Sequence, residues 1–167
     1  VLEWSRDSRQ LLRGGVRSEI HDIDTGLRVP LSKTVWSWDG DGRFWVVDAD
    51  SLVMRRRSEE VLARQAAPPS GIRRVVRVPG QRLLLETGKG EIWTIDELLA
   101  TPPQPLISES AYPRAIGITP RGNVVTASWT HALWHDPLNG AVLTYTRLHP
   151  PAWAFAFARN DSLMAVA

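Results

Sequence analysis

The chain has 167 residues, 43% of them hydrophobic, and a formal net charge of only +2. This length and composition suit a folded unit with a real core and exclude wholesale disorder. The lack of cysteine excludes disulfide frameworks and thiolate metal sites. The longest apolar stretch, Ala152 to Ala158, is far too short to span a bilayer.

The first part of the chain has the pattern of short strands separated by turns. We expect strands at Leu2 to Trp4, Gln10 to Arg13, Glu19 to Asp22 and Leu27 to Val29. A second unit begins near Thr34. In that unit Asp39-Gly40-Asp41-Gly42 closes a hairpin, because Asp-Gly between two extended runs is a strong hairpin signal.

The pattern changes after Met54. Arg55 to Ala67 contains helix formers, with Ser58 as a candidate cap and Pro68-Pro69 as a stop. This segment is either a short helix at the edge of the unit or an irregular outer strand. A second short helical segment is expected at Asp96 to Ala100.

Strands and turns return in the last part of the chain. Val124 to Ala127 is small and β-branched, which favours a strand. Asp136 to Gly140 combines four residue types that make turns. A further unit begins at Ala154, and the sequence contains two of its strands.

The strand-and-turn unit recurs at a regular spacing. Equivalent turns are anchored on Asp7, Asp41, Gly80, Gly122 and Asp161, at intervals of 34, 39, 42 and 39 residues. A period near 40 with four strands in each repeat is typical of β-propeller blades. We therefore predict an all-β propeller segment over residues 1–167, with blades at about 1–31, 34–67, 72–107, 115–147 and, in part, 154–167. Five unrelated hairpins are the alternative.

Several of these units resemble WD-repeat blades. The resemblance is carried by Leu2 to Arg9 (LEWSRDSR) with Ile20 to Gly26, by Gly90 to Asp96, and by Leu133 to Asp136 with Asn139-Gly140. It covers nearly the whole chain, with quinoprotein-like propellers as the alternative. No Gly-His dipeptide opens a blade, and the one Trp-Asp pair, Trp38-Asp39, lies on a first strand. The residues therefore do not predict the buried network of Asp, His, Ser/Thr and Trp that the family has.

The sequence contains no catalytic motif. The serines lack a Gly-x-Ser-x-Gly frame, His131 and His135 do not complete a zinc site, and Asp39 to Asp50 lacks the ligand spacing of a calcium loop. We expect no catalytic residue, no metal and no cofactor. A propeller enzyme, such as a hydrolase or a quinone-dependent dehydrogenase, is the alternative.

Positive charge is concentrated between Arg55 and Arg82. Eight arginines in this segment face two acids, Glu59 and Glu60, which gives it a net charge of +6. Such a patch can bind nucleic acid, and this is a further alternative. No aromatic side chain that could stack on bases lies within the segment, so we favour a solvated surface.

Eight tryptophans are the unusual feature of the composition. Those on predicted strands should fill the space between neighbouring blades: Trp4, Trp38, Trp45, Trp93, Trp134 and Trp153. Trp36 alternates with Trp38 and is expected on the same face of its strand. Trp129 lies in a turn and is a candidate binding hot spot, or else it folds back over the core.

The resemblance implies that one face of the propeller binds partners, as is common in WD-repeat proteins. That face carries the turns between second and third strands and the loops between blades. The partner-binding residues we expect in the turns are Arg17, Asp50, Lys89, Trp129 and His131, and those in the loops are Lys33, Arg73, Tyr112, Arg114 and Trp153. This basic and aromatic rim suits a peptide or an acidic protein surface. The expected function is a protein-interaction scaffold or ligand-sensing module within a larger multidomain protein.

Four units and half of a fifth make an open arc, whereas closed propellers have about four to eight full blades. The chain also begins at Val1, without an initiator Met. We therefore expect the remaining blades of a larger propeller of about seven blades, or a second copy of the chain, to close the ring. We also expect a cytoplasmic location and no nucleic-acid or membrane partner.

Overall fold

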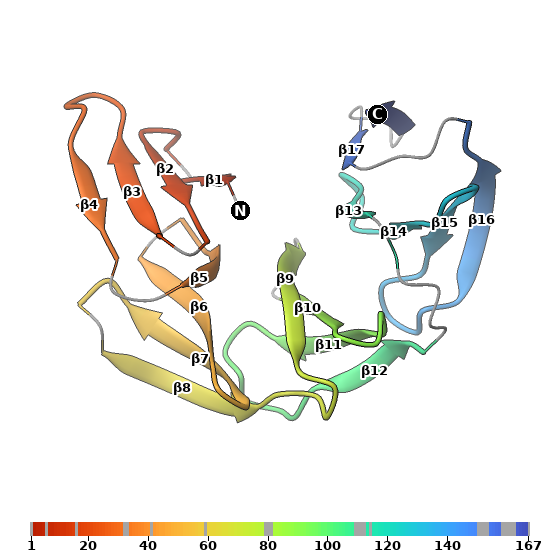
Figure 1. Cartoon of the computed structure of the whole chain (residues 1–167), viewed down its shortest axis with the longest axis horizontal. Helices are drawn as coiled ribbons and strands as arrows, with labels where there is room; N and C mark the ends of the chain where they lie inside the picture. The colour runs from red at the N-terminus through yellow and green to blue at the C-terminus, as the bar shows by residue number, and fades with distance from the viewer. Residues whose placement is uncertain are drawn as a thin grey trace.

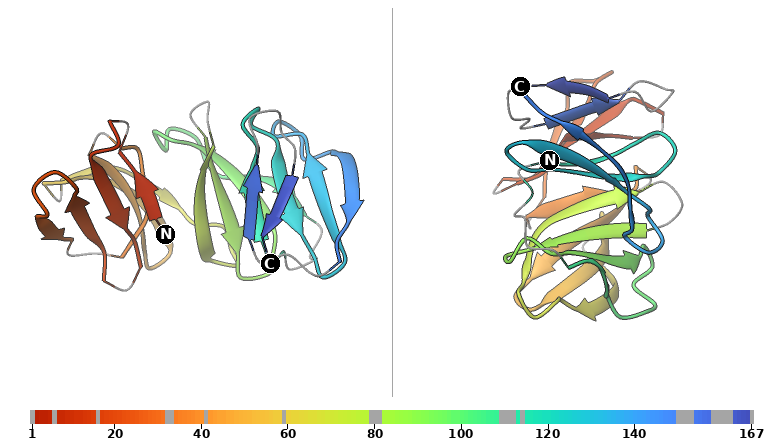
Figure 2. Two further views of the ribbon diagram at one scale, coloured as in Figure 1. Left: turned by 90° about the horizontal axis from the view of Figure 1, so that it is seen from above. Right: turned by 90° about the vertical axis from the view of Figure 1, so that its right-hand side faces the viewer.

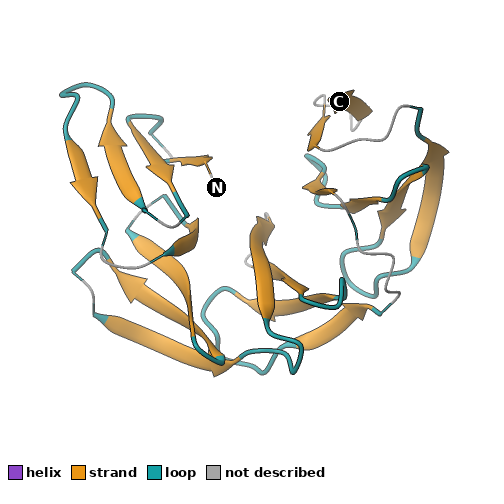
Figure 3. Ribbon diagram, in the orientation of Figure 1, coloured by secondary structure: helices purple, strands orange, loops and turns teal. Residues whose placement is uncertain are grey.

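Strands make up all the regular structure of the described residues. The computed structural model describes residues 2–5, 7–15, 17–31, 34–40, 42–58, 60–78, 82–108, 113, 115–149, 154–157 and 163–166. Within them the elements are strands β1 to β18, with no helix (Figure 3). The prediction of an all-β fold is confirmed.

The strands form antiparallel sheets in which each strand pairs with its neighbours in sequence, so each sheet is one blade. Blade 1 contains β1 (Leu2–Trp4), β2 (Gln10–Arg13), β3 (Glu19–Asp22) and β4 (Arg28–Pro30). Blade 2 contains β5 (Val35–Trp38), β6 (Arg43–Asp48), β7 (Ser51–Arg56) and β8 (Val61–Ala66). Blade 3 contains β9 (Ile72–Val78), β10 (Arg82–Thr87), β11 (Ile92–Asp96) and β12 (Gln104–Ile107). Blade 4 contains β13 (Ala115–Ile118), β14 (Val124–Ala127), β15 (His131–His135) and β16 (Val142–Arg147), and β17 (Ala154–Phe157) pairs with β18 (Leu163–Val166).

The blades stand side by side along an arc (Figure 1). The first strand of each four-stranded blade lies innermost, and the fourth strand lies at the outer rim. Connections between blades are short, so consecutive blades are neighbours in space. The turns gather on two opposite faces of the arc (Figure 2).

Hydrophobic clusters fill the seams between neighbouring blades. Their members are Leu12, Ile20, Val35, Trp38, Phe44, Val46 and Val53 between blades 1 and 2; Trp45, Leu52, Met54, Val75, Leu83, Leu85, Ile95 and Leu99 between blades 2 and 3; and Val78, Leu84, Ile92 and Val124 between blades 3 and 4. β10 explains the pattern, because Leu83 and Leu85 pack toward blade 2 whereas Leu84 packs toward blade 4. A strand buried on both faces requires such an uninterrupted apolar run.

Most of the described tryptophans lie in the seams or pack against them. Trp45 and Trp38 are buried, and Trp38 stacks on Phe44 with ring centroids 5.9 Å apart. Trp36 packs against the cluster of blades 2 and 3, on the opposite side from Trp38, because the register of β5 shifts between Val35 and Ser37. The prediction of one shared face was therefore wrong. Trp4 is 57% exposed, so it does not belong to a seam between the described blades.

The remaining strand tryptophans fit the prediction where they are described. Trp93 is half-buried and packs against the cluster between blades 2 and 3. Trp134 is half-buried and packs against a further cluster on blade 4. Trp153 lies outside the described residues.

The expected helices are absent from the described parts of 55–67 and 96–100. Residues 61–66 form β8, the outer strand of blade 2, which was the alternative for this segment. Pairing with β7 completes the sheet and overrides the local preference for helix. At Asp96 the carboxylate accepts hydrogen bonds from the backbone N–H groups of Ala100 and Thr101, at 3.0 and 2.9 Å. Leu99 adopts a positive φ of 58°, so the backbone forms a turn there.

Polar bonds also cross the seam between blades 2 and 3. Trp45 Nε1 donates to the backbone oxygen of Glu97 at 3.0 Å. Arg77 of blade 3 donates across the seam to the backbone oxygen of Asp39 at 3.2 Å, and within blade 3 to the Glu97 carboxylate at 2.8 Å. Since Glu97 and Asp39 are buried, these bonds satisfy groups that would otherwise destabilise the interior.

A carboxylate network joins the linker before blade 3 to one of its turns. Glu91 Oε2 accepts hydrogen bonds from Ser70 Oγ (2.9 Å), Thr87 Oγ1 (3.2 Å) and Trp93 Nε1 (3.3 Å). The network ties together the linker before β9, the end of β10 and the start of β11. The sequence did not predict it. The bond from Ser70, then that from Trp93, lowers the pKa of Glu91 below its ordinary value.

The turn between β15 and β16 of blade 4 packs closely on blade 3. Gly140 has a φ of +73°, and a Cβ added there would lie 1.9 Å from the backbone oxygen of Leu106 on β12. Only glycine fits both the backbone conformation and this contact. The turn thus fastens blade 4 to the outer strand of blade 3.

Gly140→Ala should destabilise the protein far more than Gly26→Ala. Gly26 has a similar φ of +69° with nothing within 4 Å of an added Cβ, so it is a matched control for backbone strain alone. We expect about 1–2 kcal/mol for Gly26→Ala and at least about 2 kcal/mol more for Gly140→Ala, where overpacking adds to strain. Denaturant unfolding measures both, and equal losses would contradict the close contact.

Glu91→Gln should cost stability at neutral pH, and the cost should shrink in acid. The folded-state pKa of Glu91 is lowered, so its ionised form contributes stability that is present above the unfolded pKa and is lost as pH falls through the folded pKa, below about 4.5. Unfolding free energies of both proteins at pH 7 and pH 3 test this. A difference that does not change between the two would show that the charge of Glu91 does not matter.

Candidate interaction face

One face of the arc carries the positions expected to bind a partner. Because every blade is antiparallel, the turns β2–β3, β6–β7, β10–β11 and β14–β15 lie at the same end as the linkers between blades. We call this end the linker face. The four turns bring Arg17, Asp50, Lys89 and Trp129 to the linker face in successive blades.

The turn residues are open to solvent. Arg17, Asp50 and Lys89 are exposed, and Trp129 is 58% exposed. These residues belong to four different blades, so they line the arc rather than form one cluster. Lys33, Tyr112, Arg114 and Trp153 fall outside the described residues.

The turn that presents Trp129 is held by its neighbours. Ser128 N donates to the backbone oxygen of His131 at 2.9 Å, and Ser128 Oγ accepts from the backbone N–H of His131 at 3.2 Å. Thr130 Oγ1 lies 2.8 Å from His131 Nδ1. These bonds fix the turn, so the exposed indole sits on a defined backbone.

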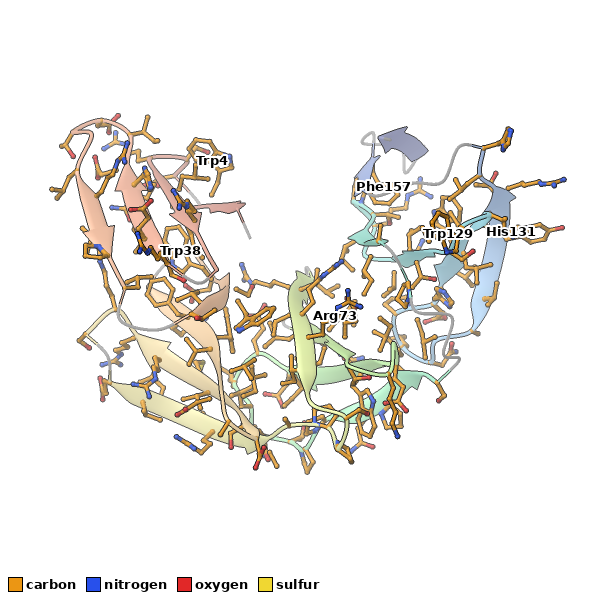
Figure 4. The ribbon with its side chains drawn as sticks, viewed as in Figure 1. Trp4, Trp38, Arg73, Trp129, His131 and Phe157 are labelled. Carbon is orange, nitrogen blue, oxygen red and sulfur yellow. The ribbon has the colours of Figure 1, made fainter. Side chains whose placement is uncertain are left out.

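His131 brings a further aromatic residue to this end of blade 4. Its ring meets the ring of Tyr145 on β16 edge-on, with centroids 5.9 Å apart. Tyr145 is 67% exposed. Sequence reasoning missed it; a Tyr within the apolar run of an outer strand was the available signal. Figure 4 shows Trp129 and His131 together over blade 4.

Arg73 does not lie in a loop between blades, as was predicted. It belongs to β9, the innermost strand of blade 3, and lies apart from this group (Figure 4). Its Nη1 lies 3.5 Å from Glu86 Oε1, and Arg74 Nε lies 3.3 Å from Glu86 Oε2. Glu86 is fully buried, so the two arginines balance its charge. The positive charge of Arg73 is therefore partly balanced by the buried carboxylate of Glu86.

A mainly apolar pocket opens between blades 3 and 4 at the linker face. Its lining includes Gly90 and Ser128 from the two turns, Pro113 from the linker, and Ile92, Ile107 and Leu133 from the sheets. It therefore lies between the turns that carry Lys89 and Trp129. Sequence reasoning did not find it, because its walls come from residues far apart in the chain.

Two polar side chains line the same pocket, Thr126 and His135. His135 Nδ1 lies 3.1 Å from the backbone oxygen of Gly140, so Nδ1 carries the proton, and Nε2 accepts from Thr126 Oγ1 at 2.9 Å. His135 thus supports the turn between β15 and β16. Within the described residues no group of three or more His, Asp or Glu is placed to hold a metal ion.

Among the described residues, no helix has the length and apolar character needed to cross a bilayer.

Comparisons with known proteins identify the fold. No family model and no curated protein matches the sequence. The structure is similar to the WD40 β-propeller domain of Doa1, with a TM-score of 0.73 and 14% identity over 98% of this chain and 58% of that chain. It is also similar to a chain of the mitotic checkpoint complex, with a TM-score of 0.69 and 12% identity over 95% of this chain and 55% of that chain.

The chain thus spans a little more than half the length of each of these structures. The resemblance of its units to WD-repeat blades is confirmed at the level of the fold. The fold is that of the WD40 β-propellers, over about half of one propeller.

Proposed function

We propose that the chain is a protein-interaction scaffold that binds a peptide segment of its partner at the junction of blades 3 and 4. The observation that carries this proposal is the apolar pocket on the linker face, flanked by the turns of Lys89 and Trp129. An apolar side chain of the partner enters the pocket, and Trp129 covers it.

The residues around the pocket suit such a contact. An exposed tryptophan on a rigid turn contributes a large contact area with little loss of conformational entropy. Lys89 adds a positive charge in the adjacent turn, which favours an acidic residue beside the partner's apolar anchor. Arg17 and Asp50 lie on blades 1 and 2 and would contact only a larger partner.

We also propose that further blades complete the propeller. Support comes from the arc of blades and from the length of the two similar structures, of which this chain covers 58% and 55%. The linker face would then continue around a closed ring.

Trp129→Ala should weaken partner binding with little effect on stability. As a hot spot, Trp129 should contribute at least about 2 kcal/mol to binding, which is about a thirtyfold change in affinity. Its loss from an exposed turn should change the unfolding free energy by less than about 0.5 kcal/mol. Partners captured from a lysate are identified by mass spectrometry, and the affinity of each is then measured for both proteins.

Leu138→Ala is the matched control. Leu138 is 72% exposed and belongs to the same blade, but it lies in the turn between β15 and β16, on the opposite face. Its replacement should leave binding unchanged. Equal effects of the two substitutions, or none from Trp129→Ala, would place the partner elsewhere.

A further inference from the structure

The outer strand of blade 4 differs from the outer strands of blades 1 to 3. β4 contains Arg28 and Pro30, β8 contains Arg64, and β12 contains Pro105. β16 reads VLTYTR and carries neither proline nor charge before its last residue. Prolines and charges protect the edges of natural sheets against pairing with other chains. The first five residues of β16 have neither, and its one charge, Arg147, stands at the end of the strand.

Three of the five exposed side chains of β16 are apolar or aromatic, and the other two are Thr144 and Arg147. Val142 and Leu143 are each 55% exposed, and Tyr145 is 67% exposed. β16 is the end strand of its sheet and lies at the outer rim (Figure 1). This position is separate from the pocket on the linker face, so it offers a second surface.

The register shows which backbone groups face outward. Leu148 N donates to the backbone oxygen of Thr130 at 2.7 Å, and the pairs continue as Thr146↔Ala132 and Tyr145↔Leu133. Hydrogen-bonded and non-hydrogen-bonded pairs alternate in an antiparallel ladder. Leu148, Thr146 and Thr144 therefore bond to β15, whereas the N–H and C=O groups of Tyr145 and Arg147 point out of the sheet.

We propose that β16 is a docking edge for an extended, acidic peptide segment of a partner protein. The segment adds to blade 4 as a fifth, antiparallel strand, and its backbone bonds to the outward groups of Tyr145 and Arg147. Apolar side chains of the segment lie against Leu143 and Tyr145. An acidic side chain at its N-terminal end lies beside Arg147.

Charge complementarity favours an acidic peptide over a second copy of the chain as the occupant of this edge. Arg147, His131 and His149 lie at one end of the β15–β16 pair, and residues 137–149 contain no Asp or Glu. Two β16 strands paired with each other would leave both Arg147 side chains without an acidic partner from either strand. A peptide with an N-terminal acid provides one.

The test uses the peptide Asp-Thr-Val-Thr-Val-Thr-Val-Thr, acetylated at its N-terminus and extended at its C-terminus by a lysine amide whose side chain carries fluorescein. Fluorescence anisotropy should show binding to the protein, about tenfold weaker when Lys replaces the Asp. Hydrogen exchange by NMR should show that the peptide protects the amides of Tyr145 and Arg147. Protection of these two amides needs no variant and tests the register directly.

Tyr145→Pro removes an outward N–H and leaves the bonds to β15 in place, since proline is tolerated where the N–H faces solvent. It should weaken binding at least about tenfold. Ala66→Pro is the control: Ala67 N donates to the backbone oxygen of Asp50 at 2.7 Å, so the N–H of Ala66 faces outward from β8. This control should bind the peptide as the unchanged protein does.

Several results would overturn the proposal. The first two are that the peptide does not bind, or that it leaves amide exchange at Tyr145 and Arg147 unchanged. The others are that Tyr145→Pro binds the peptide as tightly as the unchanged protein does, or that light scattering shows self-association through β16. Binding to the linker face is tested separately by Trp129→Ala, so failure of one proposal leaves the other standing.

Discussion

Packing between blades is the constraint on which the structure depends. A four-stranded sheet with apolar residues on both faces cannot bury them alone. β10 shows this most clearly, because Leu83, Leu84 and Leu85 are all buried yet pack toward two different neighbours. Folding of one blade therefore requires the next, as in other repeat proteins. The bonds from Trp45 to Glu97 and from Arg77 to Asp39 then fix how blades 2 and 3 meet.

The same constraint leaves particular parts of the protein available for binding. Residues in the middle of the strands form the seams, so the turns, the linkers and the outer strands remain at the surface. Hydrogen bonds such as those of Ser128 with His131, and of Glu91 with Ser70, hold these surface segments in place. A rigid framework with defined surface loops suits recognition of other proteins. We propose two such surfaces, the pocket between blades 3 and 4 beside Trp129 and the edge of β16 on blade 4.

Local sequence signals predicted the fold better than the details of the candidate site. Turn residues recurring every 40 residues or so indicated the blades, and Asp-Gly and Asn-Gly sequences marked turns correctly. Residues 61–66 became a strand because pairing with β7 outweighed helix propensity. The side on which Trp36 packs depended on a register shift, and the network around Glu91 was not predicted. The pocket and the exposed Tyr145 depend on contacts between blades, which local patterns do not contain.

Trp45→Ala tests the central claim that neighbouring blades stabilise one another. Trp45 belongs to blade 2, is fully buried, and packs against Leu83 and Leu85 of blade 3. The substitution should cost about 3–5 kcal/mol. The decisive measurement is amide hydrogen exchange resolved by strand. We predict that protection falls in both β5–β8 and β9–β12. A loss confined to β5–β8 would show that the blades are independent and would contradict the account.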